Sequence, residues 1–395
     1  MSTLFCRNGR SDSLVLEGRL AGGECVAVTV TEGVIAAIEP TTATPHVLAP
    51  AFVDPHVHLR SPGREDEETI ASGTAAAAAG GYCAILAMPN TDPVVDSAAV
   101  LGSLVETARR DALIPTGFMA AISKRLGGEE LTEMGELADA GAAAFTDDGR
   151  PVTSAGLMRR ALQYGAVTGR LLALHCEEPT LSRDGQVHEG AVCAEERPLH
   201  LMHLSARESV AALRRAHERG IAATAEVTPH HLVLTDEAVR SLDANLKMNP
   251  PLRAEDDRQA LLEALRDGTI SCVATDHAPH SREEKEEPFE DAPFGVTGLE
   301  TAFAALHTHL VRPGLLPLET LLERMSGGPA RALGLPEPTI EVGARANLVL
   351  LDLDAEWTAT EDGFRSRSSN SWLLGRTLRG RVLKTVADGR LVHAA

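Results

Sequence analysis

The stretch from residue 50 to residue 339 repeats one pattern, in which a short apolar run is followed by a stretch of helical length. Short apolar runs bounded by polar residues or glycine are typical of strands that are buried on both faces. The stretches between them, such as 97–110, 155–164, 206–219 and 256–267, have the spacing of amphipathic helices. We therefore expect eight strands, at 52–58, 82–88, 115–122, 142–147, 171–176, 199–204, 222–228 and 270–275.

The alternation of strand and helix predicts the fold of this middle segment. Eight strands that alternate with helices are typical of a parallel (β/α)8 barrel, also called a TIM barrel. Such a barrel carries its functional residues at the C-terminal ends of its strands. Polar residues that directly follow the expected strands are therefore the first candidates for a functional site.

The two ends of the chain carry a different pattern, in which apolar and polar residues alternate. Short alternating runs occur at 13–18, 25–28, 34–38, 346–352 and 381–390. This period is typical of short antiparallel strands. We expect the ends to meet in one small composite β-sandwich domain, formed by residues 1–49 and 340–395. Residues 50–339 would then form the separate barrel domain.

The net charge and the cysteines limit the classes of binding partner and the cellular compartment that we expect. The net charge is −19, from 37 basic and 56 acidic residues, which argues against nucleic acid and anionic membranes as partners. No run of about 18 apolar residues could span a bilayer, and we see no signal peptide. Six cysteines lack paired spacing, so we expect free thiols and a cytoplasmic location. An anionic substrate would need local cations to bind it.

The first candidate metal ligands are two histidines at the end of the first expected strand. His56 and His58 are two residues apart, so on a strand both side chains point to one face and can bind one metal ion together. Arg60 adds a fixed cation that is suited to binding a carboxylate. A lone pair of this kind is more often structural, but further ligand-type residues follow other strands.

Those further residues follow the fourth, fifth, sixth and eighth expected strands. They are Asp147 and Asp148, His175, His203, and Asp276. Four histidines and two aspartates, namely Asp276 and one of the two adjacent residues Asp147 and Asp148, are enough for two divalent ions that share one bridging carboxylate. Nitrogen and oxygen ligands without a thiolate suit Zn²⁺, with Mn²⁺ or Co²⁺ as alternatives.

This ligand set indicates the type of reaction. Two divalent ions can hold an activated hydroxide and polarise a carbonyl group. Asp276 is placed to take a proton from that water and to pass it to a leaving nitrogen. The pattern therefore indicates metal-assisted hydrolysis of an amide-type bond.

Other polar residues near the strand ends suggest the substrate. Asn90, Asn249 and His280 follow the second, seventh and eighth strands, and with Arg60 they could bind a carboxylate and a ring amide. Asparagine is also common in turns, so a structural role remains open for both asparagines. We interpret the two histidines His230 and His231 as structural residues or as residues that orient the metal ligands.

These residues stand in motifs that resemble those of the dihydroorotases, which belong to the amidohydrolase superfamily. The resemblance covers nearly the whole chain, and the motifs together are specific. The matching stretches are 54–60, 88–91, 144–149, 226–232, 247–253, 274–280 and 293–295. The resemblance implies reversible, metal-dependent cyclisation of N-carbamoyl-L-aspartate to (S)-dihydroorotate, a step of pyrimidine biosynthesis.

The resemblance also implies a role for each matching residue. The implied metal ligands are His56 and His58 for the first ion, His175 and His203 for the second, Asp148 as the bridge, and Asp276 as ligand and proton shuttle. The implied substrate contacts are His58, Arg60, Asn90 and His280, with Asn249, Phe294 and Gly295 at the ring. Many relatives in the superfamily bridge their metals with a carboxylated lysine. With an aspartate here, we expect no such modification.

Two segments depart from the family pattern or from its chemistry. Residues 178–199 connect the fifth and sixth strands without the helix that family members usually carry there. We hypothesise that the outer face of these strands is bare or is covered by a partner subunit, and we expect a homo-oligomer. The acidic loop 281–292 is expected to be a mobile lid, although its charge is unusual beside an anionic substrate.

Two alternative functions remain open. The first is a non-catalytic dihydroorotase-like subunit that scaffolds aspartate transcarbamoylase, which usually goes with lost metal ligands. The second is another cyclic amidase, acting on hydantoins or allantoin, which would be expected to use the lysine bridge. The retained ligands and the expected carboxylate contacts favour the dihydroorotase, with aspartate transcarbamoylase kept as a candidate partner.

Overall fold

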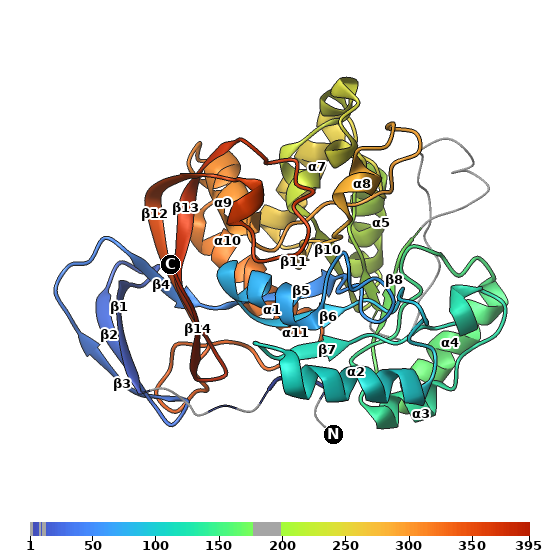
Figure 1. The fold of residues 1–395 in the computed structure, drawn as a ribbon, viewed down its shortest axis with the longest axis horizontal. Coiled ribbons are helices and arrows are strands. Elements are labelled where there is room, and N and C mark those ends of the chain that lie inside the picture. The colour runs from blue at the N-terminus through green and yellow to red at the C-terminus, as the bar shows by residue number, and fades with distance from the viewer. Residues whose placement is uncertain (1–2, 8, 10–12, 177–198) are drawn as a thin grey trace.

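A ring of parallel strands lies at the centre of the molecule and is surrounded by helices (Figure 1). The computed structural model describes residues 3–7, 9, 13–176 and 199–395. The strands of the ring are β5 (Phe52–Val57), β6 (Tyr82–Ala87), β7 (Thr116–Phe118), β8 (Leu172–Leu174), β9 (Leu199–Leu201), β10 (Ala223–Val227) and β11 (Cys272–Val273). β5 to β7 pair in one parallel group and β8 to β11 in another.

Two irregular pairings join these groups into a closed barrel. Segment 142–147, predicted as the fourth strand, lies between β7 and β8, but only Phe145 pairs on both sides, with Ala120 and Leu172. Its neighbours in 143–146 still exchange backbone hydrogen bonds with the flanking strands. On the opposite side, Val57 pairs with His277, just beyond β11. The predicted barrel is confirmed, with a fourth strand that is shorter than expected.

The helices around the barrel begin and end at residues that favour helix termini. Thr69, Ser97 and Ser154 precede α1, α2 and α4, and each side chain accepts a hydrogen bond from the backbone three residues on. Gly169 and Gly268 end α4 and α7 in the left-handed conformation. The longer helices are α1 (Ile70–Ala79), α2 (Ala98–Asp111), α3 (Met134–Ala140), α4 (Ala155–Thr168), α5 (Arg207–Glu218), α7 (Glu255–Asp267) and α10 (Leu318–Met325).

Short helical segments fill the connections between these elements. They are α6 (Pro229–Val233), α8 (Arg282–Lys285), α9 (Ala302–Leu306) with η4 (His307–Val311), α11 (Gly327–Ala332), and the turns η1 (Lys124–Leu126), η2 (Asp236–Ser241), η3 (Ala244–Leu246) and η5 (Glu361–Gly363). The four helices that the sequence predicts correspond to α2, α4, α5 and α7 within a few residues.

The two chain ends form a seven-stranded sheet beside the barrel (Figure 1). Its strands are β1 (Leu14–Arg19), β2 (Cys25–Thr31), β3 (Val34–Pro40), β4 (Val47–Pro50), β12 (Leu348–Thr358), β13 (Thr377–Ala387) and β14 (Arg390–Ala394). The order is β14-β13-β12-β4-β1-β2-β3, so β4 and β12 join the two ends. Val28, Ile35, Leu348 and Val386 belong to one shared core. The domain boundaries themselves stay a prediction.

β4 leads directly into the first barrel strand. It ends at Pro50 and β5 begins at Phe52, so the same run of chain belongs to both the sheet and the barrel. Leu348 of β12 pairs with Pro50 at this point. The strand that carries the first candidate ligands is therefore held by residues from the far end of the sequence.

Several other expectations meet the structure here. Residues 177–198, which hold nearly all of the connection predicted to have lost a helix, lie outside the described residues. The cysteines within the described chain are free thiols. Among the described residues, no helix is both long and apolar enough to cross a membrane.

Candidate metal centre and substrate pocket

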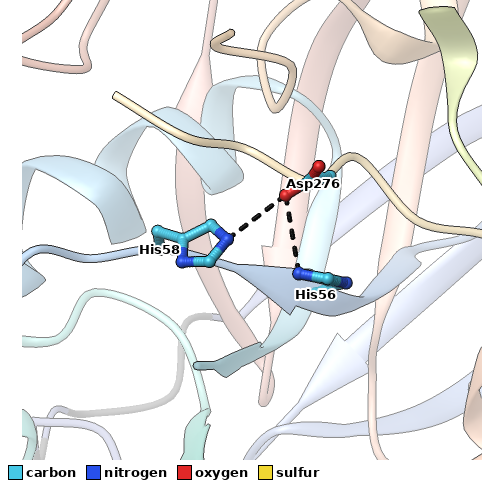
Figure 2. Close-up of side chains that lie close together, drawn as sticks. All are labelled: His56, His58 and Asp276. Carbon is cyan, nitrogen blue, oxygen red and sulfur yellow. Dashed lines mark hydrogen bonds and ion pairs between the residues drawn. The ribbon is translucent and has the colours of Figure 1, made fainter. Parts of the chain in front are cut away.

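The two histidines of the first strand meet the aspartate that follows the last strand. His56 lies in β5 and His58 directly follows this strand, and Asp276 faces both from the loop after β11 (Figure 2). Asp276 Oδ1 lies 3.4 Å from His56 Nε2 and 3.2 Å from His58 Nε2. All three side chains are buried. They form one group of closely spaced donor atoms.

Asp148 stands between this group and a second pair of histidines. Its Oδ2 atom lies 3.7 Å from His56 Nε2 and 3.5 Å from His58 Nε2. Its Oδ1 atom lies 3.6 Å from both His175 Nδ1 and His203 Nε2. One carboxylate oxygen therefore faces each pair of imidazoles, which is the arrangement that a bridging ligand requires. The structure brings all six predicted ligands into one cluster of side chains.

The charges in this pocket favour a bound cation. Burial alone would lower the pKa of His56, but Asp148, Asp276 and Glu226 raise it well above its usual value. Burial would likewise raise the pKa of Asp148 and Asp276, but the imidazoles around them hold both well below the usual range. A site that attracts a proton this strongly also attracts a metal ion.

The donor atoms fit a pair of divalent ions. His56 Nε2 is buried and has no hydrogen-bond partner among the described residues. It belongs to two groups of closely spaced donors, one with His58 and Asp276 and the other with Asp148 and His203. Both groups offer imidazole nitrogen and carboxylate oxygen, which are ligands that divalent transition metals accept.

Three site residues have backbone conformations that residues with side chains rarely adopt. The φ angles of Arg60, His203 and Asp276 are 54°, 33° and 48°. Such left-handed conformations cost free energy and persist only where the surrounding structure holds them. At these three positions, each just after a barrel strand, the fold therefore determines the direction of the side chain.

Glu226 supports the metal centre from behind, and we did not predict this role. His56 Nδ1 donates to Glu226 Oε1 at 2.8 Å, and His200 Nε2 donates to Glu226 Oε2 at 2.9 Å. The backbone N–H of His203 also points to Oε1, at 3.3 Å. A carboxylate that binds the far nitrogen of a ligating histidine fixes its tautomer and orientation. Glu226 thus connects a candidate ligand of each ion.

Replacing Glu226 by glutamine should weaken metal binding. The amide keeps the shape but can no longer accept from both His56 and His200, so one imidazole loses its anchor. We expect roughly 10–100-fold weaker binding, as for other partners of ligating histidines. Competition with a chelator measures this. The matched control is the exposed Glu237→Gln on η2, and equal affinity in both variants would contradict the role.

Three of the predicted substrate residues lie around the same pocket. Asn90 accepts from His58 Nδ1 at 2.9 Å and donates to Asp148 Oδ2 at 3.4 Å. Arg60 and His280 face each other, with 3.2 Å between Arg60 Nη2 and His280 Nε2. Arg60, Asn90 and His280 are thus brought together next to the candidate metal ligands, while their contacts with substrate stay a prediction.

Asn249, Phe294 and Gly295, the residues predicted at the substrate ring, form an adjoining wall. Gly295 has a φ angle of 114°, and a Cβ atom there would lie 2.6 Å from Ala278 Cβ, so only glycine fits. Its N–H donates to Lys247 O at 2.9 Å, which places the loop containing Asn249 beside it. Asn249 is half-buried, and Phe294 is 46% exposed.

Asn370 holds this wall in place through hydrogen bonds. The sequence did not predict this role. Its side chain donates to Ala278 O at 3.0 Å and to Gly295 O at 3.2 Å, and its Oδ1 accepts from His280 N at 3.1 Å. It lies in the segment between β12 and β13, far from the strand ends in sequence. No motif that we recognised contains it.

The two histidines after β10, His230 and His231, lie in different surroundings. His231 donates to Pro250 O at 2.9 Å and pairs with the Thr228 hydroxyl at 2.7 Å, so both ring nitrogens are used structurally. This contact anchors the loop that carries Asn249. Burial lowers the pKa of the neighbouring His230 to about 4, so its ring is neutral.

Comparison with known proteins places this fold and site in a known class. The model of the amidohydrolase family matches residues 194–393, and that of the dihydro-orotase-like family matches residues 45–196. An L-hydantoinase (dihydropyrimidinase) from Arthrobacter aurescens has the same fold, with a TM-score of 0.83 over 95% of this chain and 94% of that chain, at 24% identity. The chain therefore has the fold of this enzyme and belongs to the amidohydrolase family.

Curated relatives show which family within this class the chain belongs to. A dihydroorotase from Anaeromyxobacter dehalogenans is 45% identical over 88% of this chain and 86% of its own. One from Caldanaerobacter subterraneus is 39% identical over 96% of each chain. The chain therefore belongs to the dihydroorotase family, as the motifs predict.

Proposed function

We propose that the protein is a cytoplasmic dihydroorotase that carries two Zn²⁺ ions and interconverts (S)-dihydroorotate and N-carbamoyl-L-aspartate in pyrimidine biosynthesis. The observation that carries the proposal is the position of Asp148, which turns one oxygen to each pair of histidines. Arg60 and His280 stand side by side beside this centre, where we expect them to contact the substrate carboxylate, with the Arg60 guanidinium as the cationic group. An aspartate bridge replaces the carboxylated lysine in this proposal.

The chain supplies the proton transfer of the reaction. Hydrolysis adds the oxygen of water to the ring carbonyl carbon, breaks the carbon–nitrogen bond, and releases the nitrogen with a proton. The imidazoles hold the pKa of Asp276 low, so its carboxylate is free to accept the proton from water and to return it to the nitrogen. Two bound divalent ions would lower the pKa of water and polarise the carbonyl.

The proposed activity can be tested directly. The purified chain, loaded with Zn²⁺, Mn²⁺ or Co²⁺ in turn, should hydrolyse dihydroorotate and cyclise carbamoyl aspartate. Under the same conditions it should turn over hydantoin and allantoin far more slowly. Two bound ions per chain with no turnover of any substrate would favour the scaffold function instead. Metal analysis of the protein as purified would identify the native ion.

The assembly belongs to the same proposal. We expect a homo-oligomer, with aspartate transcarbamoylase as a candidate partner, because the sequence of the connection 178–199 shows little helical period where family members usually carry a covering helix. The mass of the purified protein in solution, measured with and without the transcarbamoylase, distinguishes a monomer, a homo-oligomer and a mixed complex.

A further inference from the structure

A buried carboxylate stands inside the region that we propose binds the carboxylate of the substrate. Glu67 lies in the loop between β5 and α1, and its side chain is 2% exposed. Its Oε2 atom lies 3.1 Å from Arg60 Nε, and its Oε1 atom lies 3.5 Å from His280 Nδ1. This fixed negative charge lies next to Arg60 and His280, the two side chains that we expect to bind an anionic substrate, and it would repel that substrate.

The contacts of Arg60 show what Glu67 does there. Arg60 Nε donates to Pro279 O at 2.9 Å and faces Glu67 at the same time. The inner edge of the guanidinium is thus occupied by the protein. Its Nη2 atom lies 3.2 Å from His280 Nε2, so the outer edge is turned to His280. A guanidinium held by its inner edge presents its terminal N–H groups in one fixed direction.

The contacts of His280 also indicate that Glu67 helps to orient a side chain next to the metal centre. Its Nε2 atom donates to Phe294 O at 2.7 Å. Its Nδ1 atom lies 3.5 Å from Glu67 Oε1 and 3.5 Å from Glu284 Oε2, on α8 of the acidic loop. The ring is therefore held through Nε2 by Phe294, and its Nδ1 faces the two carboxylates without a hydrogen bond to any residue that the structure describes.

A metal ion is a poor occupant for this cluster, although Glu67, His280 and Glu284 are close enough to share one. Arg60 already pairs with Glu67, and Arg64 Nη2 lies 2.8 Å from Glu67 and 2.9 Å from Glu284. Two guanidinium groups balance the two carboxylates. A divalent cation would add charge to a cluster that is already neutralised.

We propose that Glu67 is a positioning residue, which aims Arg60 and His280 at the substrate and so selects cyclic ureides that carry a carboxylate over neutral rings. This proposal rests on the proposed function. It also gives the acidic loop a role, because Glu284 closes the same cluster from the side of α8. The opposing effect is electrostatic, since the charge of Glu67 repels an anionic ligand.

Two substitutions separate positioning from repulsion. Glu67→Ala removes both the charge and the anchor, whereas Glu67→Gln removes the charge and keeps a hydrogen-bond acceptor for Arg60. If positioning dominates, we expect Glu67→Ala to weaken orotate binding to the metal-loaded enzyme by roughly 10-fold and Glu67→Gln by clearly less. If repulsion dominates, both variants bind orotate more tightly, and the proposal is overturned.

Calorimetry with orotate, a carboxylate-bearing ring, provides the readout, together with the KM and kcat for dihydroorotate. The proposal expects the loss in KM rather than kcat and two metal ions in each variant, which also shows that the variants fold. Asp66→Asn is the matched control, because Asp66 is the exposed neighbour that pairs with Arg64, and it should bind orotate as the wild type does.

The outcomes also separate this proposal from the proposed function. Wild-type protein that binds orotate and turns over dihydroorotate, with Glu67→Ala unchanged, would overturn the positioning role alone. Metal-loaded wild-type protein that neither binds orotate nor turns over dihydroorotate would overturn the proposed function, and the role of Glu67 with it.

Discussion

Replacing Asp276 by asparagine should reduce the kcat for dihydroorotate by roughly 10²–10⁴-fold, the usual contribution of a general acid–base group. Asparagine keeps the shape of the side chain and can still face His56 and His58, but it cannot take up a proton. The loss corresponds to about 3–5 kcal/mol of transition-state stabilisation. Steady-state kinetics in both reaction directions measure it, because one group serves hydrolysis and cyclisation.

Metal analysis must accompany this measurement, since Asp276 is also a candidate ligand. A variant that keeps two ions and loses turnover identifies the proton shuttle, whereas a variant that loses an ion along with turnover identifies a ligand role only. Asp362→Asn, an exposed aspartate in η5, is the control for the substitution itself. Activity of Asp276→Asn within a few-fold of the wild type would rule out the proposed shuttle.

Replacing Asp148 by alanine should have the largest effect on metal content. The substitution removes the only carboxylate oxygens that face both pairs of histidines among the described residues. We expect metal affinity to fall by more than roughly 100-fold, because loss of an outer partner alone costs up to that factor. Turnover should be lost with the metal. Metal stoichiometry after dialysis against a weak chelator tests this.

The neighbouring aspartate provides a matched contrast. Asp147 Oδ1 accepts from the N–H groups of Ile122 and Ser123 at 2.8 and 3.0 Å, and its other oxygen accepts from the Ser123 hydroxyl. Asp147→Ala should therefore lower the free energy of unfolding by on the order of 2–4 kcal/mol. It should leave two ions bound to the folded protein. Metal loss in this variant and not in Asp148→Ala would reverse the two assignments.

The sequence predicted the positions of the candidate ligands because each follows an apolar run. In a parallel barrel all such positions meet at one rim, so the order of strands along the chain was enough to bring His56, His175 and Asp276 together. The choice between Asp147 and Asp148 could not come from this argument. It depended on the resemblance, and the structure now explains it, since Asp147 turns to the backbone at Ser123.

The supporting residues could not be predicted in the same way. Glu226 reaches His56 across 170 positions of sequence, and Asn370 reaches His280 across 90. Such partners are set by how β10 and the segment before β13 pack against the barrel, which no local pattern records. Glu226 did stand in a recognised motif, and a buried acid on an apolar strand is a signal for a paired charge. Asn370 offered no comparable signal.

The pairing of β4 with β12 has a consequence for the biosynthesis of the protein. The strand that leads to the first two histidines continues β4, whose partner β12 is translated much later than β4 itself. Asn370, which braces the loop of His280, emerges later still. A nascent chain thus lacks the braces of its own reaction centre until Asn370 has been translated. We therefore expect metal loading to follow that point, and a product that stops before Asn370 to be inactive.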